Sequence, residues 1–211
     1  MAFLLLLQGV PRLLYSTMIL ILALVLVAVL ALLAYLISGG LAEVTVRTAQ
    51  PFVKGSWKIA YKVSTGPYRN ASTFFAEIKR LVPQGAMVGI YYDDPRIMEP
   101  TDLRWVAGVV LEMDGKSLVD DACELMLDRR GYRVATLPAI QKSILADFPN
   151  HTRFSPILGA KRVYQKITEY TNETGVGGHP AIELYNLDPS LIFYMMPLEK
   201  HEQFMLPGVP Q

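Results

Sequence analysis

The carboxylate of Glu183 is the side chain in this sequence whose surroundings best fit a ligand site. It lies in the run Ala181-Ile-Glu-Leu-Tyr185, which predicts a β-strand. Alternate residues of a strand point to opposite faces, so Glu183 and Tyr185 share a face. We expect that face to be open, and Ile182 and Leu184 to point into a helix-covered core. A carboxylate among aromatic rings attracts cationic or hydrogen-bonding ligands, whereas a solvated strand glutamate has no such role.

Other reactive residue types occur without the spacing that chemistry requires. His151, His179 and His201 lie in loop-like contexts and lack metal-ligand spacing. Cys123 falls in a predicted helix, where a buried, inert thiol is expected. The glycines of residues 175–178 follow a helix instead of opening one, so they form no phosphate cradle. The sequence therefore predicts no catalytic residues, no metal and no cofactor, which is typical of a non-enzymatic protein.

A repeated motif indicates an internal duplication. Tyr91-Tyr-Asp-Asp94-Pro95 and Tyr185-Asn-Leu-Asp188-Pro189 both read Tyr-x-x-Asp-Pro, 94 residues apart. Asp-Pro forms turns well, because Asp caps the turn and Pro fixes φ. Two hairpins could share this turn by chance. However, both copies end a predicted strand that follows a predicted helix, so we favour duplication. Tyr91 would then join Glu183 and Tyr185 on one open groove, with Tyr92 on the other side.

The elements that must position these residues follow from hydrophobic periodicity. Residues 57–63 alternate, and residues 86–92 and 103–113 read as further strands. Apolar residues recur at helical spacing over 71–82 and 156–173, and a helix begins after a capping-box-like Ser117-Leu-Val-Asp120. The pattern predicts an α+β domain of two β-β-α-β-β units, in one sheet or two joined sheets, with the helices on one face.

The N-terminal region predicts a membrane anchor. Residues 13–42 contain no charged side chain, and Thr17 to Ile37 is a continuous Leu-, Val-, Ile- and Ala-rich run. A bilayer core needs about 20 apolar residues in a helix. A cleaved signal peptide would have a shorter apolar core after a basic start, which the first 11 residues lack. We therefore expect a short N-terminal extension at residues 1–12 and a transmembrane helix within 13–42.

Charge places the remaining chain in the cytosol. Only Arg12 precedes the apolar run, whereas Arg47, Lys54, Lys58 and Lys62 follow it, and basic residues mark the cytosolic side. Three glycosylation sequons, at Asn70, Asn150 and Asn172, argue for the lumen, but such triplets also arise by chance. The single cysteine suits a reducing compartment. We expect the domain to be cytosolic and the sequons unmodified.

Net charge argues against one class of partner. Arg12 is the only charged residue among the first 42, so the rest of the chain carries 19 basic and 19 acidic side chains. A balanced domain lacks the basic surface of nucleic-acid-binding proteins. Membrane lipid, protein partners or a small molecule in the groove are the expected partners.

Several segments resemble the membrane-anchored branch of the GyrI-like domain family. They are residues 61–68 (Tyr-Lys-Val-Ser-Thr-Gly-Pro-Tyr), 88–95 (Val-Gly-Ile-Tyr-Tyr-Asp-Asp-Pro), 104–108 (Arg-Trp-Val-Ala-Gly), 180–185 (Pro-Ala-Ile-Glu-Leu-Tyr) and 196–198 (Met-Pro-Leu). The resemblance covers the anchor and nearly all of residues 43–198. It implies a duplicated β-α-β-β fold with a ligand groove, and a glutamate facing that groove at the position of Glu183.

The resemblance also implies a role. The anchored branch consists of single-pass endoplasmic-reticulum proteins with cytosolic domains. They act as receptors for selective autophagy of that organelle and as adaptors in protein–DNA crosslink repair. Their autophagy motif lies in a long acidic tail, which this sequence does not contain beyond Leu198. Aromatic-x-x-aliphatic matches occur at Phe75–Ile78, Phe154–Ile157 and Tyr164–Ile167, of which the first and last fall in predicted core helices.

The leading hypothesis is an anchored binding or adaptor domain at the endoplasmic-reticulum membrane, resembling a reticulophagy receptor. It would comprise a GyrI-like domain at residues 43–200 and a short tail at 201–211. The alternative is a small-molecule-binding or hydrolase-like domain that uses Glu183. A closed pocket with a raised glutamate pKa would favour the alternative, and a wide groove would favour the adaptor.

Overall fold

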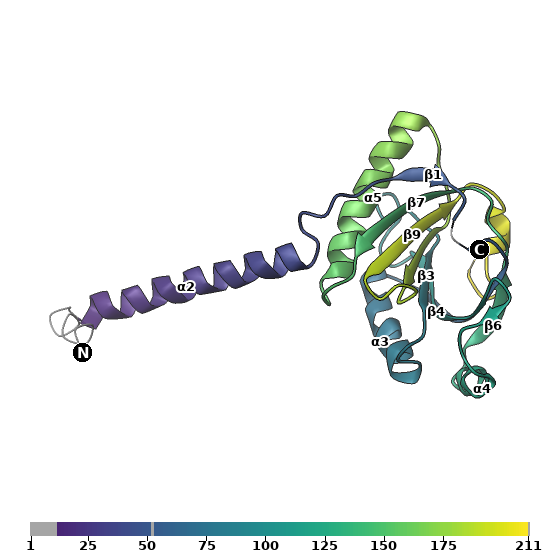
Figure 1. Cartoon of the computed structure of the whole chain (residues 1–211), viewed down its shortest axis with the longest axis horizontal. Coiled ribbons are helices and arrows are strands. Elements are labelled where there is room, and N and C mark those ends of the chain that lie inside the picture. Colours follow the sequence, from purple (N-terminus) through teal and green to yellow (C-terminus); the bar gives the residue numbers. More distant parts are fainter. Residues whose placement is uncertain (1–11, 52, 211) are drawn as a thin grey trace.

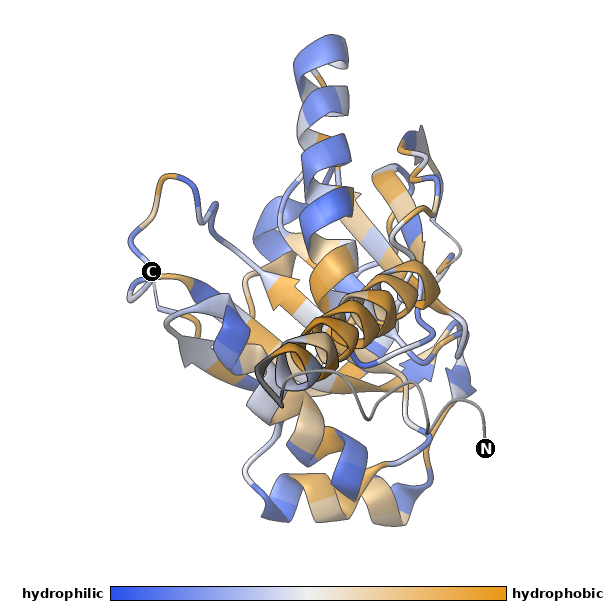
Figure 2. Ribbon diagram, turned by 90° about the vertical axis from the view of Figure 1, so that its left-hand side faces the viewer, coloured by the Kyte–Doolittle hydropathy of each residue, from blue (hydrophilic) through white to orange (hydrophobic). Residues whose placement is uncertain are grey.

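The computed structural model describes residues 12–51 and 53–210, and its longest helix projects away from the sheet (Figure 1). The expected N-terminal extension, residues 1–12, lies outside the described residues except for Arg12. The projecting helix is α2 (Arg12–Ile37). Its apolar stretch, Leu14–Ile37, is long enough to cross a membrane and is not buried against the protein. Figure 2 shows that this helix is apolar on all sides, as a lipid-exposed helix must be.

Helix α2 ends in a glycine cap. Gly39 adopts a left-handed φ of 95°, which a residue without a Cβ reaches at little cost. The amide of Gly40 bonds to the carbonyl of Tyr35 at 2.9 Å, and the amide of Gly39 bonds to that of Leu36 at 3.1 Å. These two bonds form a Schellman motif. They end the helix at the point where the apolar run of the sequence stops.

The rest of the described chain forms one antiparallel sheet with helices packed on it. In the described residues the sheet has nine strands, in the order β1-β7-β9-β8-β3-β4-β2-β6, with β5 paired to β4. The strands are β1 (Arg47–Ala49), β2 (Trp57–Thr65), β3 (Met87–Tyr91), β4 (Arg104–Met113), β5 (Lys116–Ser117), β6 (Arg133–Leu137), β7 (Ser143–Pro149), β8 (Ala181–Tyr185) and β9 (Leu191–Pro197).

The three helices of this region begin and end close to the predicted positions. Helix α4 starts after Asp120, whose side chain accepts a hydrogen bond from the amide of Cys123 at 2.7 Å. Helix α5 ends at Gly175, which is left-handed. The helices are α3 (Ala71–Leu81), α4 (Asp121–Arg129) and α5 (Ser155–Thr174), with short 3₁₀ turns η2 (Tyr68–Asn70) and η3 (His201–Phe204).

The two halves of the sheet share one order. The chain runs strand, helix, strand, strand in β2-α3-β3-β4 and again in β7-α5-β8-β9. Strands β3 and β8 pair at the centre, β4 and β9 flank them, and β2 and β7 follow. Read outward from the centre, each half therefore places its third strand beside its second and its first strand beyond.

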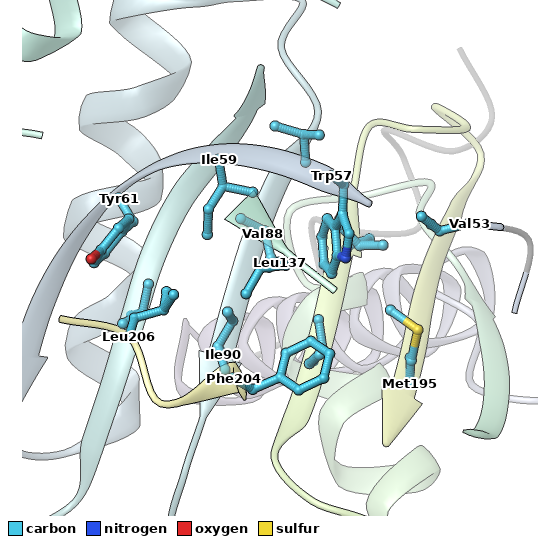
Figure 3. Close-up of a cluster of buried hydrophobic side chains, with 14 of the residues drawn as sticks. Val53, Trp57, Ile59, Tyr61, Val88, Ile90, Leu137, Met195, Phe204 and Leu206 are labelled. Carbon is cyan, nitrogen blue, oxygen red and sulfur yellow. The ribbon is translucent and has the colours of Figure 1, made fainter. Parts of the chain in front are cut away.

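Both faces of the sheet are buried. The helices cover one face, where residues from α3, α4 and α5 join a single apolar cluster: Ala71, Ile78, Leu127, Val163 and Ile167. Helices on one face agree with the prediction. The other face holds a second cluster, and Figure 3 shows Phe204 and Leu206 among the side chains of its strands.

The last described residues belong to this second cluster. Phe204, Leu206 and Val209 are all buried. The hydroxyl of Tyr92 donates to the carbonyl of Phe204 at 2.9 Å, and that of Tyr61 donates to the carbonyl of Pro207 at 3.1 Å. Residues 201–210 are thus part of the domain, and the prediction of a separate tail there is wrong. They cover the face opposite the helices, which carries Ile182 and Leu184.

Candidate functional site

Glu183 lies at the centre of the sheet and is 4% exposed. It pairs with Gly89 of β3 on one side and with Tyr194 of β9 on the other. Its side chain, like that of Tyr185, points to the helix-covered face. Ile182 belongs to the opposite cluster, which the C-terminal segment covers.

The predicted assignment of the two faces is therefore wrong. The alternation correctly separates Glu183 and Tyr185 from Ile182 and Leu184, but the helices pack on the glutamate side. The physical reason is that the face of Ile182 and Leu184 needs no helix to bury it, because residues 201–210 pack on it. Glu183 lies in a closed polar cluster between sheet and helices instead of in an open groove.

Tyrosine hydroxyls hold the Glu183 carboxylate. Tyr164 of α5 donates to Oε1 at 2.8 Å, and Tyr185 donates to Oε2. The hydroxyl of Tyr91 also lies close enough to the carboxylate to lower its pKa. The ring of Tyr91 folds back over Gly89, where a Cβ would lie only 2.9 Å from the Tyr91 hydroxyl. A glycine opposite Glu183 is therefore needed to let this ring reach the carboxylate.

Further aromatic rings surround this group. The ring centroids lie 4.9 Å apart for Tyr68–Tyr91, 5.2 Å for Phe75–Tyr185 and 5.7 Å for Tyr164–Tyr194. The first and last pairs meet edge to face, an arrangement that aromatic quadrupoles favour. We call Glu183 with Tyr91, Tyr164, Tyr185 and Tyr194 the Glu183 cluster.

The cluster is set up to retain protons. Burial raises the pKa of Glu183, and the hydrogen bonds from Tyr185, Tyr164 and Tyr91 offset part of that rise. Burial, followed by the negative charge of Glu183, raises the pKa of Tyr164 and Tyr185 well above the ordinary value. The tyrosines therefore act as hydrogen-bond donors, and Glu183 binds its proton more tightly than a solvated carboxyl does.

One hydroxyl of the cluster has no hydrogen bond among the described residues. Tyr194 is 1% exposed, and its hydroxyl oxygen is buried without a protein partner. An unpaired buried polar group costs about 1–3 kcal/mol. A small polar molecule that bonded to this hydroxyl would remove that cost.

The structure brings together the three site residues that the sequence singled out. Glu183, Tyr185 and Tyr91 converge, although inside the protein. Tyr164 and Tyr194 were not predicted as site residues. Tyr164 falls within the apolar pattern predicted for residues 156–173, and a hydroxyl-bearing ring in that pattern was the available signal. Tyr194 carries no local signal, because its place beside Glu183 depends on strand pairing.

The two Asp-Pro turns have the same local hydrogen bond. Asp94 accepts from the amide of Arg96 at 2.9 Å, and Asp188 accepts from the amide of Ser190 at 2.8 Å. Hydrogen bonding from Arg96 lowers the pKa of Asp94, and hydrogen bonding from Ser190 lowers that of Asp188. Pro95 and Pro189 follow these caps. The four residues thus shape turns and do not contact Glu183 in the described hydrogen bonds.

Other reactive side chains are dispersed. In the described part of the chain, no three His, Cys, Asp or Glu side chains converge as metal ligands would. His179 and His201 contact each other with ring centroids 5.3 Å apart, and burial, then the charge of His201, lowers the pKa of His179. Burial raises the pKa of the free Cys123 thiol, which makes it a poor nucleophile.

These features define a class: a mixed α/β domain with an antiparallel sheet, following an apolar helix that fits a membrane protein. The chain is homologous to testis-expressed protein 264. It is 31% identical to the mouse homolog over 174 residues, 82% of this chain and 55% of the mouse protein. It is 30% identical to human testis-expressed protein 264 over 188 residues, 89% of this chain and 58% of the human protein. The chain thus spans somewhat more than half the length of these relatives.

No protein-family model matches the sequence. Among solved structures, a hydrolase from Listeria innocua aligns with 74% of this chain and 91% of its own length, at 8% identity and a TM-score of 0.43. The C-terminal domain of EcmrR aligns with 74% of this chain and 97% of its own length, at 11% identity and a TM-score of 0.43. Similarity at this level does not transfer function.

Proposed function

We propose that the chain is a single-pass membrane protein that displays a binding or adaptor domain on the cytosolic side of the endoplasmic reticulum. The observation that carries this proposal is α2, whose apolar stretch of 24 residues is unburied and leads directly into a folded domain. The homology to testis-expressed protein 264 supports it. The basic residues that follow α2 favour the cytosolic orientation.

We further propose that the domain is a GyrI-like duplication of β-α-β-β units. The matching strand order about the β3–β8 pair supports this proposal. So does the repeated hydrogen bond of the Asp94 and Asp188 turns. On this proposal β2 corresponds to β7, α3 to α5, β3 to β8 and β4 to β9.

Glycosylation tests the orientation. Asn70 and Asn172 are exposed on the domain, so a lumenal domain would present both sequons to the glycosylation machinery. The intact chain should be made in the presence of microsomes and then treated with a glycosidase. We expect no mobility shift and complete digestion of the domain by added protease. A shift that is lost when Asn70, Asn150 and Asn172 are changed to Gln would place the domain in the lumen.

The autophagy-receptor and crosslink-repair roles come to this chain only through the family resemblance. Two of the three aromatic-x-x-aliphatic matches lie within helices, with Ile78 and Ile167 buried, and the third begins at Phe154, the N-cap of α5. Recognition by strand addition needs an extended, accessible segment. We therefore expect the described residues to bind autophagosomal ubiquitin-like proteins weakly. Tight binding by the chain, lost on changing Phe154, would refute this expectation.

A second function is favoured by one observation: a buried carboxylate of raised pKa among tyrosine hydroxyls. Perturbed, buried acids are typical of ligand or catalytic sites. A cation with an aromatic ring would suit the carboxylate and the surrounding rings. An aryl-trimethylammonium probe should raise the melting temperature of the chain if the Glu183 cluster binds such ligands. Glu183→Gln should abolish that shift, and the absence of a shift in the unsubstituted chain would refute the idea for this ligand class.

A further inference from the structure

We propose that the domain touches the bilayer through a patch formed by Leu41 and the start of α5, which inserts apolar side chains at the level of the lipid headgroups. The patch consists of Leu41, Phe154 and Ile157, with Arg153 and Lys161 beside them. The proposal rests on the proposed membrane insertion of α2. It adds a second membrane contact, made by the folded domain itself.

The domain is fixed to the end of α2. Ser38, which follows the last residue of the apolar span, is 2% exposed and hydrogen-bonds through Oγ to Oγ1 of Thr152 at 2.7 Å. Arg162 donates from Nη1 to the carbonyls of Gly39 and Gly40, each at 2.6 Å. With α2 in a membrane, these bonds hold the start of α5 at the bilayer surface.

Apolar side chains are exposed near the end of α2 and at the start of α5. Leu41 is 78% exposed, Phe154 is 48% exposed and Ile157 is 73% exposed. Leu41 lies four residues beyond Ile37. Phe154 is two residues from Thr152, which limits their Cα–Cα separation to about 7 Å. Figure 2 shows the base of α5 as apolar beside the end of α2, whereas its distal turns are hydrophilic.

Basic side chains accompany these exposed apolar residues. The guanidinium of Arg153 lies over the ring of Phe154, 5.0 Å from its centroid. Lys161 is exposed and lies one helical turn after Ile157. Basic side chains beside exposed apolar ones match the headgroup region, where cations meet lipid phosphates and apolar groups reach the acyl chains.

A protein partner for Phe154–Ile157 fits the structure less well. Ser155 is fully buried, and its Oγ accepts hydrogen bonds from the amides of His151 and Thr152 at 3.2 and 3.1 Å. These bonds hold the first turn of α5 in place. A partner that reads the segment as an extended strand would have to break them, whereas a bilayer contacts the side chains as they stand.

Tryptophan quenching in lipid tests the proposal. The full chain should be reconstituted in nanodiscs containing phosphatidylcholine brominated near the headgroup end of the acyl chains, or unbrominated lipid. The native tryptophans, Trp57 and Trp105, are buried in the domain, so the unsubstituted chain supplies the background. We expect the emission added by Phe154→Trp and by Ile157→Trp to be lost in brominated lipid.

Two controls separate the possible failures. Leu125→Trp places an indole on α4, at a 52%-exposed position on the side of the domain away from α2 (Figure 1), and its emission should survive. Leu32→Trp, at a 57%-exposed position of α2 five residues before Ile37, should be quenched, because it lies near the headgroup end of the span. Quenching of Leu32→Trp without quenching of Phe154→Trp or Ile157→Trp would overturn the patch and leave its side chains free for a protein. No quenching of Leu32→Trp would overturn the membrane insertion of α2, and the patch with it.

Discussion

Replacing Glu183 by Gln should raise the thermal stability of the chain at neutral and alkaline pH and change it little in acid. Burial raises the pKa of Glu183 above 4.5, its ordinary value. A raised acid pKa gives stability that is fully present below the unfolded pKa and is lost as pH rises through the folded pKa. Glutamine resembles the protonated carboxyl and does not ionise, so its stability contribution does not fall with pH.

The size of the gain follows from the linkage between pKa and stability. Each unit by which the folded pKa exceeds the unfolded one corresponds to about 1.4 kcal/mol above the folded pKa. In a domain of this size, 1 kcal/mol shifts the melting temperature by about 2–4 °C. The Gln amide keeps one oxygen for the Tyr164 hydroxyl and turns a donor toward Tyr185, whose hydroxyl can also accept. The substitution therefore leaves no new unpaired group.

The assay is thermal unfolding of the full chain in detergent, followed by the fluorescence of Trp57 and Trp105 from pH 4.5 to pH 9. The melting temperature of Glu183→Gln minus that of the unsubstituted chain should increase with pH. Glu169→Gln is the matched control on α5, because its partner Lys166 lowers the pKa of Glu169. That variant should show no such gain. A difference in melting temperature that does not change with pH would refute the raised pKa of Glu183. A Glu183→Gln variant that is less stable than the unsubstituted chain at high pH would refute it as well.

Three further substitutions test the packing. Ile182→Ala should lower the free energy of unfolding by about 2–5 kcal/mol, because Ile182 is fully buried and Ala leaves a cavity; an unchanged denaturant midpoint would contradict its place in the core. Phe204→Ala should cost about 3–5 kcal/mol, whereas the neighbouring exposed Met205→Ala should cost little; equal effects would mean that the C-terminal segment does not close the sheet. Asp93→Asn should cost about 1.5–3 kcal/mol at neutral pH through loss of its charged bonds to Arg104. Burial raises the pKa of Asp93, but the hydrogen bonds and charge of Arg104 lower it by a larger amount, so the pKa lies below 3.8. The cost should therefore shrink as pH falls below 3.8, and acid titrations of both proteins would show this change.

Local pattern sufficed for the elements and for the convergence of Tyr91, Glu183 and Tyr185. Alternation within residues 181–185 told which side chains share a face. It could not tell which face the helices cover, since that depends on what else packs on the sheet. Here residues 201–210 bury the opposite face, although Phe204, Leu206 and Val209 follow neither a helix nor a strand period.

The residues that surround Glu183 illustrate a second limit. Tyr164 comes from α5 and Tyr194 from the neighbouring strand β9. Their approach to Glu183 depends on register between strands and on the packing of a helix, neither of which a single sequence specifies locally. A closed polar cluster, and hence the raised pKa of Glu183, could be read only from the assembled fold.

The clamped Ser38-Gly-Gly40 junction has a mechanical consequence. Two glycines after an apolar helix would ordinarily act as a swivel, letting a domain tumble over the membrane. Here Thr152 and Arg162 form hydrogen bonds with all three residues, so the domain and α2 should move as one rigid body. If α2 spans a bilayer as proposed, a force applied to the distal edge, where β6 lies (Figure 1), would tilt the helix instead of bending the chain at residues 38–40. Arg162 makes two of the three hydrogen bonds that hold this junction, so its loss would let the domain move more freely relative to α2.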